Sequence, residues 1–209
     1  MDVVTDLTVV PGPSARTSRA TVVLLHGYGR YPGQLLDVWP DTGCAVLAAQ
    51  AGFRIGPGAY RWFDYQDQAD GTVVIDRDEE RSSWDALVRF LDALDGPVYL
   101  VGHSQGGMMA LSVLLLRPEL IDGCAVLNAR ILPEALERRP DGVAIDGVPV
   151  FVGHSVGDTV VPVHKGRRTR ESLARAGAAL TYREYQGDHE LTADVVADIA
   201  RWLDGAIHD

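Results

Sequence analysis

The amino-acid sequence predicts an α/β fold, in which helices flank both faces of a doubly wound, mostly parallel sheet. Short apolar runs alternate along the chain with longer amphipathic segments. Most of the apolar runs are continuous and several are rich in Val, as in parallel strands that are covered on both faces. The length of 209 residues suits one domain with a full hydrophobic core, so we expect a single domain over 1–209.

The alternation assigns each element to a stretch of sequence. We expect strands at Thr21–Leu25, Ala45–Ala49, Val98–Val101, Gly123–Leu127, Val148–Val152 and Leu180–Tyr185. We expect helices at Ser83–Leu94, Gln105–Leu116, Pro133–Arg138, Gly166–Ala176 and Thr192–Leu203. Ser82 or Ser83 is the expected N-cap of the first helix. Sheets of this kind carry their sites at the carboxyl ends of the strands, so the loops that follow the strands are where we look for chemistry.

The composition is that of a globular protein with an acidic balance. Apolar residues make up 46% and charged residues 23%, and the formal net charge is -10. Nucleic acids and anionic membranes both attract basic surfaces, so neither partner is expected. Met1–Thr8 lacks the basic start of a secretory signal, and no apolar run has the length of an integral membrane segment.

The two cysteines, Cys44 and Cys124, each lie in an apolar run. We expect two buried free thiols, as in a reducing compartment, and hence a cytoplasmic protein. No cluster of cysteines and histidines has zinc-ligand spacing, so neither a metal nor a cofactor is expected. The oligomeric state stays open.

The strongest functional motif is the pentapeptide GHSQG at 102–106, which fits the pattern G-x-S-x-G. It follows the apolar run Val98–Val101 and opens an apolar helix, the context that this motif requires. Glycines on both sides of Ser104 allow a sharp turn that exposes the serine oxygen. Free N–H groups at the helix N-terminus favour negative charge beside it. The motif therefore predicts Ser104 as a nucleophile.

A serine nucleophile needs a base, and the position of His189 fits that role best. His189 follows the last expected strand and precedes the last helix, which places it at a strand's carboxyl end after Ser104 in the chain. His26 and His103 come too early for the order Ser, then Asp or Glu, then His. His208 lies in the last residues, which usually fray.

The third member of a triad should orient the imidazole of the base. Asp158 follows the strand expected at Val148–Val152 and falls between Ser104 and His189 in the chain. Asp188 is a rival, but it neighbours His189 and is poorly directed toward it. Asp146 precedes its strand and so lies at the wrong edge. Asp158 is the predicted acid.

The oxyanion of an acyl-transfer intermediate needs two preorganised donors. One is expected to be the backbone N–H of Gln105, the residue after the nucleophile, and the other comes from the loop after the first strand. In that loop we choose the N–H of Tyr28, with Gly27 as the alternative. His26 is expected to be structural.

The remaining motifs are weaker. The aromatic stretch RWFDY at 61–65 is equally consistent with a substrate pocket and with a minor core, and packing is the default interpretation of Met108 and Met109. Candidate pocket residues are Tyr28, Trp62, Phe63, Met108 and Leu132. The acidic residues are expected to form a solvated loop, since they lack calcium-loop spacing: Asp64, Asp67, Asp70, Asp76, Asp78, Glu79 and Glu80.

Taken together, these segments resemble the α/β-hydrolase superfamily and, within it, the phospholipase/carboxylesterase family that includes the acyl-protein thioesterases. The matching segments span about Thr21 to Leu203 and are LLHGYG at 24–29, WFD at 62–64, GHSQGG at 102–107, LP at 132–133, DTVVP at 158–162 and GDHEL at 187–191. His103 stands where this family more often has Phe. The chain is also compact, with little room for a large cap domain.

The resemblance implies hydrolysis of carboxylic esters or thioesters without a cofactor, with small-molecule substrates. It assigns Ser104, Asp158 and His189 to a triad and the Tyr28 and Gln105 amides to the oxyanion hole. Two alternatives keep the fold: a non-hydrolytic activity such as perhydrolase or lyase chemistry, and a ligand-binding module.

Overall fold

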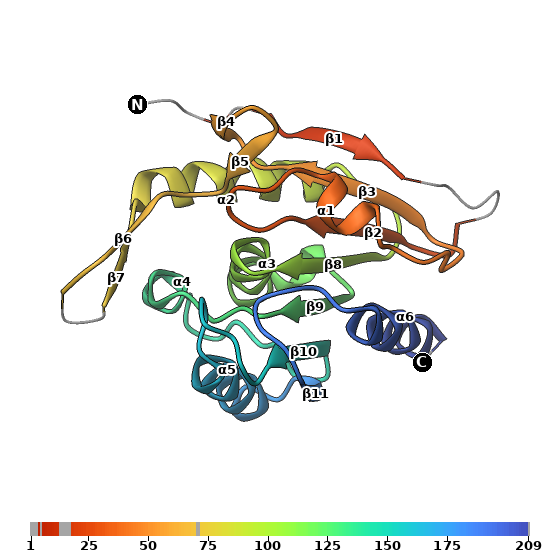
Figure 1. Ribbon diagram of the computed structural model, residues 1–209. Coiled ribbons are helices and arrows are strands. Elements are labelled where there is room, and N and C mark those ends of the chain that lie inside the picture. Colours follow the sequence, from red (N-terminus) through yellow and green to blue (C-terminus); the bar gives the residue numbers. More distant parts are fainter. Residues whose placement is uncertain (1–3, 5, 13–17, 70–71, 209) are drawn as a thin grey trace.

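The computed structural model describes residues 4, 6–12, 18–69 and 72–208. In these residues a seven-stranded sheet has the strand order β1-β3-β2-β8-β9-β10-β11 (Figure 1). The strand bounds are β1 Thr8–Pro11, β2 Thr21–Leu25, β3 Ala45–Gln50, β8 Val98–His103, β9 Gly123–Leu127, β10 Pro149–Ser155 and β11 Ala179–Tyr185. The short edge strand β1 is antiparallel to β3, and all other pairs in this sheet are parallel. The six expected strands are the six parallel ones.

Helices cover both faces of the sheet, so successive residues of each strand enter different cores. On one face, Val23 and Leu25 of β2 pack with α2 (Arg77–Asp92), α3 (Gln105–Leu116), α4 (Pro133–Arg138) and α5 (Val163–Arg175). On the other, Val22 and Leu24 pack with α1 (Gly33–Leu36) and α6 (Ala193–His208), which lie across the sheet from α3 and α5 (Figure 1). This two-sided burial explains the continuous apolar runs, and the predicted doubly wound α/β class is confirmed.

Helix α2 begins at Arg77, earlier than predicted, because Asp76 and not Ser82 or Ser83 caps it. The Asp76 carboxylate accepts the N–H groups of Asp78 and Glu79 at 3.0 Å each. The acidic residues of the first turn also suit the positive end of the helix dipole. The Ser83 hydroxyl instead lies in the core and donates to the carbonyl of Trp62.

Two antiparallel hairpins connect β3 to α2. One pairs β4 (Phe53–Gly56) with β5 (Ala59–Arg61), and the other pairs β6 (Tyr65–Asp67) with β7 (Val73–Ile75). The second hairpin projects from the body of the molecule (Figure 1).

The prediction of a solvated acidic loop is wrong about the loop, because Asp67 lies in β6 and 78–80 lie in α2. Asp67, Asp76 and Asp78 are exposed, as expected. Two residues of the predicted loop form ion pairs: Glu79 binds Arg61 of β5 at 2.8 Å, and the buried Glu80 binds Arg138 of α4 at 2.6 Å. Asp70 lies outside the described residues.

Other expectations concern the cysteines and the membrane. Cys44 and Cys124 are both buried and free, as predicted. No helix in the described part of the chain combines the length and the apolar character needed to cross a bilayer. The segment Met1–Thr8, for which no secretory signal is expected, lies partly outside the described residues.

Candidate active site

Ser104 lies in the sharp turn that joins β8 to α3. Its φ of 53° and ψ of -119° are unusual for a residue with a side chain. The turn needs glycine on both sides: a Cβ on Gly102 would lie 2.5 Å from the backbone of Gly106, and a Cβ on Gly106 would lie 2.2 Å from the carbonyl oxygen of Leu25. The strand, the turn and the helix thus meet too closely for any other residue type.

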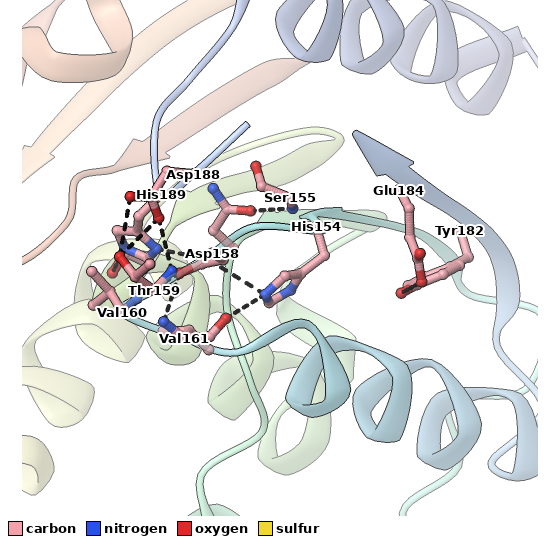
Figure 2. A network of polar contacts seen from close by, with 12 residues as sticks. His154, Ser155, Asp158, Thr159, Val160, Val161, Tyr182, Glu184, Asp188 and His189 are labelled. Atoms are coloured by element: carbon pink, nitrogen blue, oxygen red, sulfur yellow. Dashed lines mark hydrogen bonds and ion pairs between the residues drawn. The ribbon is translucent and has the colours of Figure 1, made fainter. Parts of the chain in front are cut away.

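The structure brings the three predicted triad residues into one chain of hydrogen bonds. The hydroxyl of Ser104 lies 2.7 Å from Nε2 of His189, and Nδ1 of His189 lies 2.8 Å from Oδ2 of Asp158. A carboxylate only accepts, so Nδ1–H donates to Asp158 and Nε2 is left to accept the serine proton. The residues come from the ends of β8, β10 and β11, and Figure 2 shows His189 beside Asp158.

Asp158 is a buried carboxylate whose oxygens are all engaged. Oδ1 accepts the N–H groups of Val160 at 2.9 Å and Val161 at 2.7 Å. Burial by itself would raise the pKa of the Asp158 carboxyl. Hydrogen bonds from His154, His189 and the Val161 N–H outweigh burial and hold its pKa well below the ordinary value. Asp158 is therefore ionised throughout the neutral range.

His154 is a second histidine on Asp158, and the sequence had given it no role. It is completely buried on β10, and its Nε2 lies 2.7 Å from the carbonyl of Val161 and 3.4 Å from Oδ2 of Asp158 (Figure 2). The carbonyl can only accept, so Nε2 carries a proton that it shares with the carboxylate. His154 therefore supports the side of Asp158 that also binds His189.

The two alternatives to Asp158, Asp188 and Asp146, do not contact the ring of His189 through a side-chain hydrogen bond in the described residues. Asp188 accepts the N–H and the hydroxyl of Thr159, at 2.7 and 3.0 Å, so its carboxylate ties together the loops after β10 and β11 (Figure 2). Asp146 precedes β10 and lies at the amino ends of the strands.

The backbone amides predicted for the oxyanion hole lack partners. Among the described residues, neither the N–H of Tyr28 nor that of Gln105 has a hydrogen-bond acceptor. The alternative, Gly27, donates its N–H to Oε1 of Gln34 at 2.8 Å, and Gly29 donates to the carbonyl of Tyr60 at 2.8 Å. Tyr28 is thus the donor that this loop leaves available.

The side chain of Gln105 binds the aromatic stretch to the turn. Its Oε1 accepts the N–H of Trp62 at 2.8 Å, and its Nε2 donates to the carbonyl of Phe63 at 2.7 Å. The indole N–H of Trp62 donates to the carbonyl of His26 at 2.9 Å. His26 is itself structural, as predicted: it is completely buried, its Nε2 accepts the N–H of Ala51 at 3.0 Å, and burial lowers its pKa to about 4.

His103 is a buried neutral neighbour of His189. Gln34 uses its oxygen for Gly27, so its Nε2 donates to Nδ1 of His103 at 3.1 Å. The ring lies 5.0 Å from that of His189. Burial, followed by repulsion from His189, lowers the pKa of His103 to about 3. His103 is therefore uncharged at neutral pH.

A cavity of about 290 Å³ opens beside Ser104. Its lining includes Ser104, Gln105 and three of the predicted pocket residues, Tyr28, Phe63 and Met108. Further lining residues come from the β6–β7 hairpin and the loops after β9 and β10: Tyr65, Asp67, Val73, Ile75, Arg130, Thr159, Val160 and Val161. Of these, only Tyr65 belongs to the aromatic stretch for which the sequence offered a pocket as one interpretation. Several lining residues are exposed and apolar, among them Tyr65, Val73 and Val160, and polar side chains line the rest of the cavity.

Trp62 and Leu132 do not line this cavity, and their assignment to the pocket is wrong for it. Both side chains are 0% exposed and belong to the core between the sheet and α3. The backbone N–H of Trp62 donates to Gln105 and its indole N–H donates to His26, so its ring lies in the core. Leu132 is the residue before the first turn of α4, and its side chain packs in the same core.

The sheet topology and the turn at Ser104 are those of the α/β-hydrolase fold. The chain belongs to the phospholipase/carboxylesterase family, whose model matches residues 53–207.

Individual relatives span almost the whole chain. A probable inactive carboxylesterase from Oryza sativa subsp. japonica is 30% identical over 92% of this chain and 88% of its own length. The crystal structure of esterase PE8 is 26% identical, with a TM-score of 0.79 over 97% of this chain and 100% of that one. Zea mays acyl-protein thioesterase 2 is 19% identical, with a TM-score of 0.76 over 96% and 99%, a likeness of fold.

Proposed function

We propose that this chain is an active serine hydrolase that cleaves carboxylic esters or thioesters through an acyl-enzyme intermediate. The observation that carries the proposal is the unbroken hydrogen-bond chain from Ser104 through His189 to Asp158, at 2.7 and 2.8 Å. Two unpartnered amides and an adjoining cavity support it.

In the first half of the reaction, Nε2 of His189 takes the proton of Ser104 as Oγ attacks the acyl carbon. The negative charge that develops on the acyl oxygen is held by the N–H groups of Tyr28 and Gln105. The ionised Asp158 stabilises the imidazolium of His189. The tetrahedral intermediate then breaks its bond to the alcohol or thiol, which leaves with the proton from His189.

In the second half, water occupies the place of the leaving group. His189 accepts a proton from this water while the water oxygen attacks the carbonyl carbon of the acyl-enzyme. The N–H groups of Tyr28 and Gln105 hold the new oxyanion. When the ester bond to Ser104 breaks, the serine oxygen recovers the proton from His189 and the carboxylic acid is released. No cofactor enters this cycle.

The description of the rice relative as inactive favours a second candidate, a ligand-binding module on the same fold. Such a module has no need for a base bonded to both a serine and an ionised acid. Non-hydrolytic chemistry, as in a perhydrolase or a lyase, is separated by its products, because hydrolysis yields an acid together with an alcohol or thiol.

The proposal is tested on a panel of p-nitrophenyl esters of increasing acyl length, with S-phenyl thioesters of the same acids. Ser104→Ala serves as the blank. We expect turnover by the native chain and a loss of at least about a thousandfold in kcat in the variant. Equal turnover by both proteins would contradict the mechanism, and binding without turnover by either would favour the ligand-binding module.

A further inference from the structure

Arg130 lies on the loop between β9 and α4, at the carboxyl end of the strand that separates the nucleophile's strand from that of Asp158. The loop is held on both sides. Asn128, with a φ of 48°, accepts the N–H of Ser155 at 2.8 Å, and the N–H of Ile131 donates to the hydroxyl of Thr169 at 3.1 Å. The backbone of Arg130 is therefore fixed at the edge of the candidate active site.

The guanidinium of Arg130 is poorly satisfied within the protein. An arginine side chain has five N–H donors, but in the described part of the chain Arg130 makes one long hydrogen bond, to the carbonyl of Ile131 at 3.5 Å, and no ion pair. Burial lowers its pKa, and the nearby charge of Glu134 opposes that effect. Arginine stays charged even so. A half-buried cation with so few partners is costly unless a ligand completes its contacts.

Arg130 lines two cavities. One is the cavity beside Ser104, and the other, of about 260 Å³, is lined also by Lys165 and Arg168 from α5 and by no acidic residue. These cations form no ion pair within the described residues, although the whole chain has a net charge of -10. Asp67 lines the first cavity from the β6–β7 hairpin and forms no ion pair with Arg130. The positive charge at this end of the site is thus held by no ion pair, and the nearby Glu134 offsets it only in part.

We propose that the substrate carries an anionic group, a carboxylate or a phosphate, which Arg130 binds while its acyl carbon lies at Ser104. The planar fork of a guanidinium matches both anions. Lys165 and Arg168 add attraction from the second cavity, and the apolar side chains that line the first cavity contact the rest of the substrate. This inference rests on the proposed hydrolase function and specifies its substrate class.

The test compares matched ester pairs that differ in one negative charge. On the acyl side, the pair is mono-p-nitrophenyl glutarate and p-nitrophenyl valerate. On the leaving-group side, the butyrate ester of 4-hydroxybenzoate is compared with that of its methyl ester, and the butyrate ester of 4-hydroxyphenyl phosphate tests phosphate in place of carboxylate. We expect the native chain to prefer the anionic member of at least one pair by about tenfold in kcat/KM.

The variants attribute that preference to one side chain. Arg130→Gln should lower the ratio of anionic to neutral kcat/KM by about tenfold, chiefly through KM, and Arg130→Lys should keep part of it. Arg175→Gln, an equal charge change at an exposed position at the end of α5, should leave the ratio unchanged. The proposal is overturned by a native chain without preference in any pair, or by an Arg130→Gln variant that loses both activities equally.

Calorimetric titration with glutarate and with inorganic phosphate separates this inference from the proposed function. If no ester is hydrolysed, the hydrolase proposal fails, and anion binding decides the inference: about tenfold weaker binding by Arg130→Gln supports it, and no binding by the native chain overturns it. If the native chain hydrolyses neutral esters but shows no preference for anionic ones, the hydrolase proposal holds and the proposed role of Arg130 is refuted.

Discussion

At the scale of single residues, Asp158 receives hydrogen bonds from two histidines, of which the sequence predicted one. His189 could be found because chain order and its place after a strand both point to it. His154 sits inside β10, where a histidine is indistinguishable in sequence from any other buried strand residue, and only the three-dimensional turn back to Asp158 gives it a partner. The assignment of Trp62 and Leu132 to the pocket was wrong for a related reason. The sequence does not tell whether an apolar residue near a motif faces the core or the pocket.

The contact of His154 predicts a positioning role. His154→Phe keeps a ring of similar size but removes a donor to Asp158, so kcat should fall about tenfold, as for the loss of one hydrogen bond to a charged group, with little change in KM. Steady-state kinetics on p-nitrophenyl butyrate measure kcat and KM separately. His164→Asn, at an exposed position of α5, is the control. An unchanged kcat in a variant that folds normally would refute the role.

At the scale of elements, the turn at Ser104 depends on the close approach of β2, β8 and α3. Gly106→Ala should destabilise the fold by about 2 kcal/mol or more, because its Cβ meets rigid backbone. Gly205→Ala is the matched control: it lies in α6 with open space around a Cβ, so it should stabilise the protein by about 0.5–1 kcal/mol. Urea unfolding measures both, and equal effects would contradict the packing described for the turn.

The elements that sequence reasoning found are those with continuous apolar runs or a clear helical period. The parallel strands are continuous apolar runs, α3 is apolar and buried on all sides, and α6 has a clear apolar face, so their positions were predicted within a few residues. Strand β1 is mostly exposed and, among the described strands, pairs only with β3, and the hairpins between β3 and α2 are too short to show alternation. The start of α2 was missed because Asp76 and Glu79 were counted as parts of an acidic loop, although an acidic N-cap and first turn also have that composition.

At the scale of the whole molecule, two buried neutral histidines make stability depend on pH. The folded pKa values of His26, about 4, and His103, about 3, lie below the ordinary 6.5. The unfolded chain therefore binds more protons below pH 6.5. Their contribution to stability is complete above that pH and is lost as the pH falls toward the folded values.

Urea unfolding at pH 7 and pH 5 measures this loss. Each histidine should contribute a fall of about 2 kcal/mol in the free energy of unfolding over this interval. His103→Phe should remove about half of the combined fall, whatever its effect on stability at pH 7. The same pH dependence in the variant and the native chain would show that His103 is protonated in the folded state.

The central claim is that Ser104 is a nucleophile activated by His189, and a fluorophosphonate tests it most directly. Mass spectrometry of the treated protein should find one adduct, on the peptide that contains Ser104, and His189→Ala should abolish rapid labelling. No adduct on the native chain, or an adduct on another serine, would contradict the account.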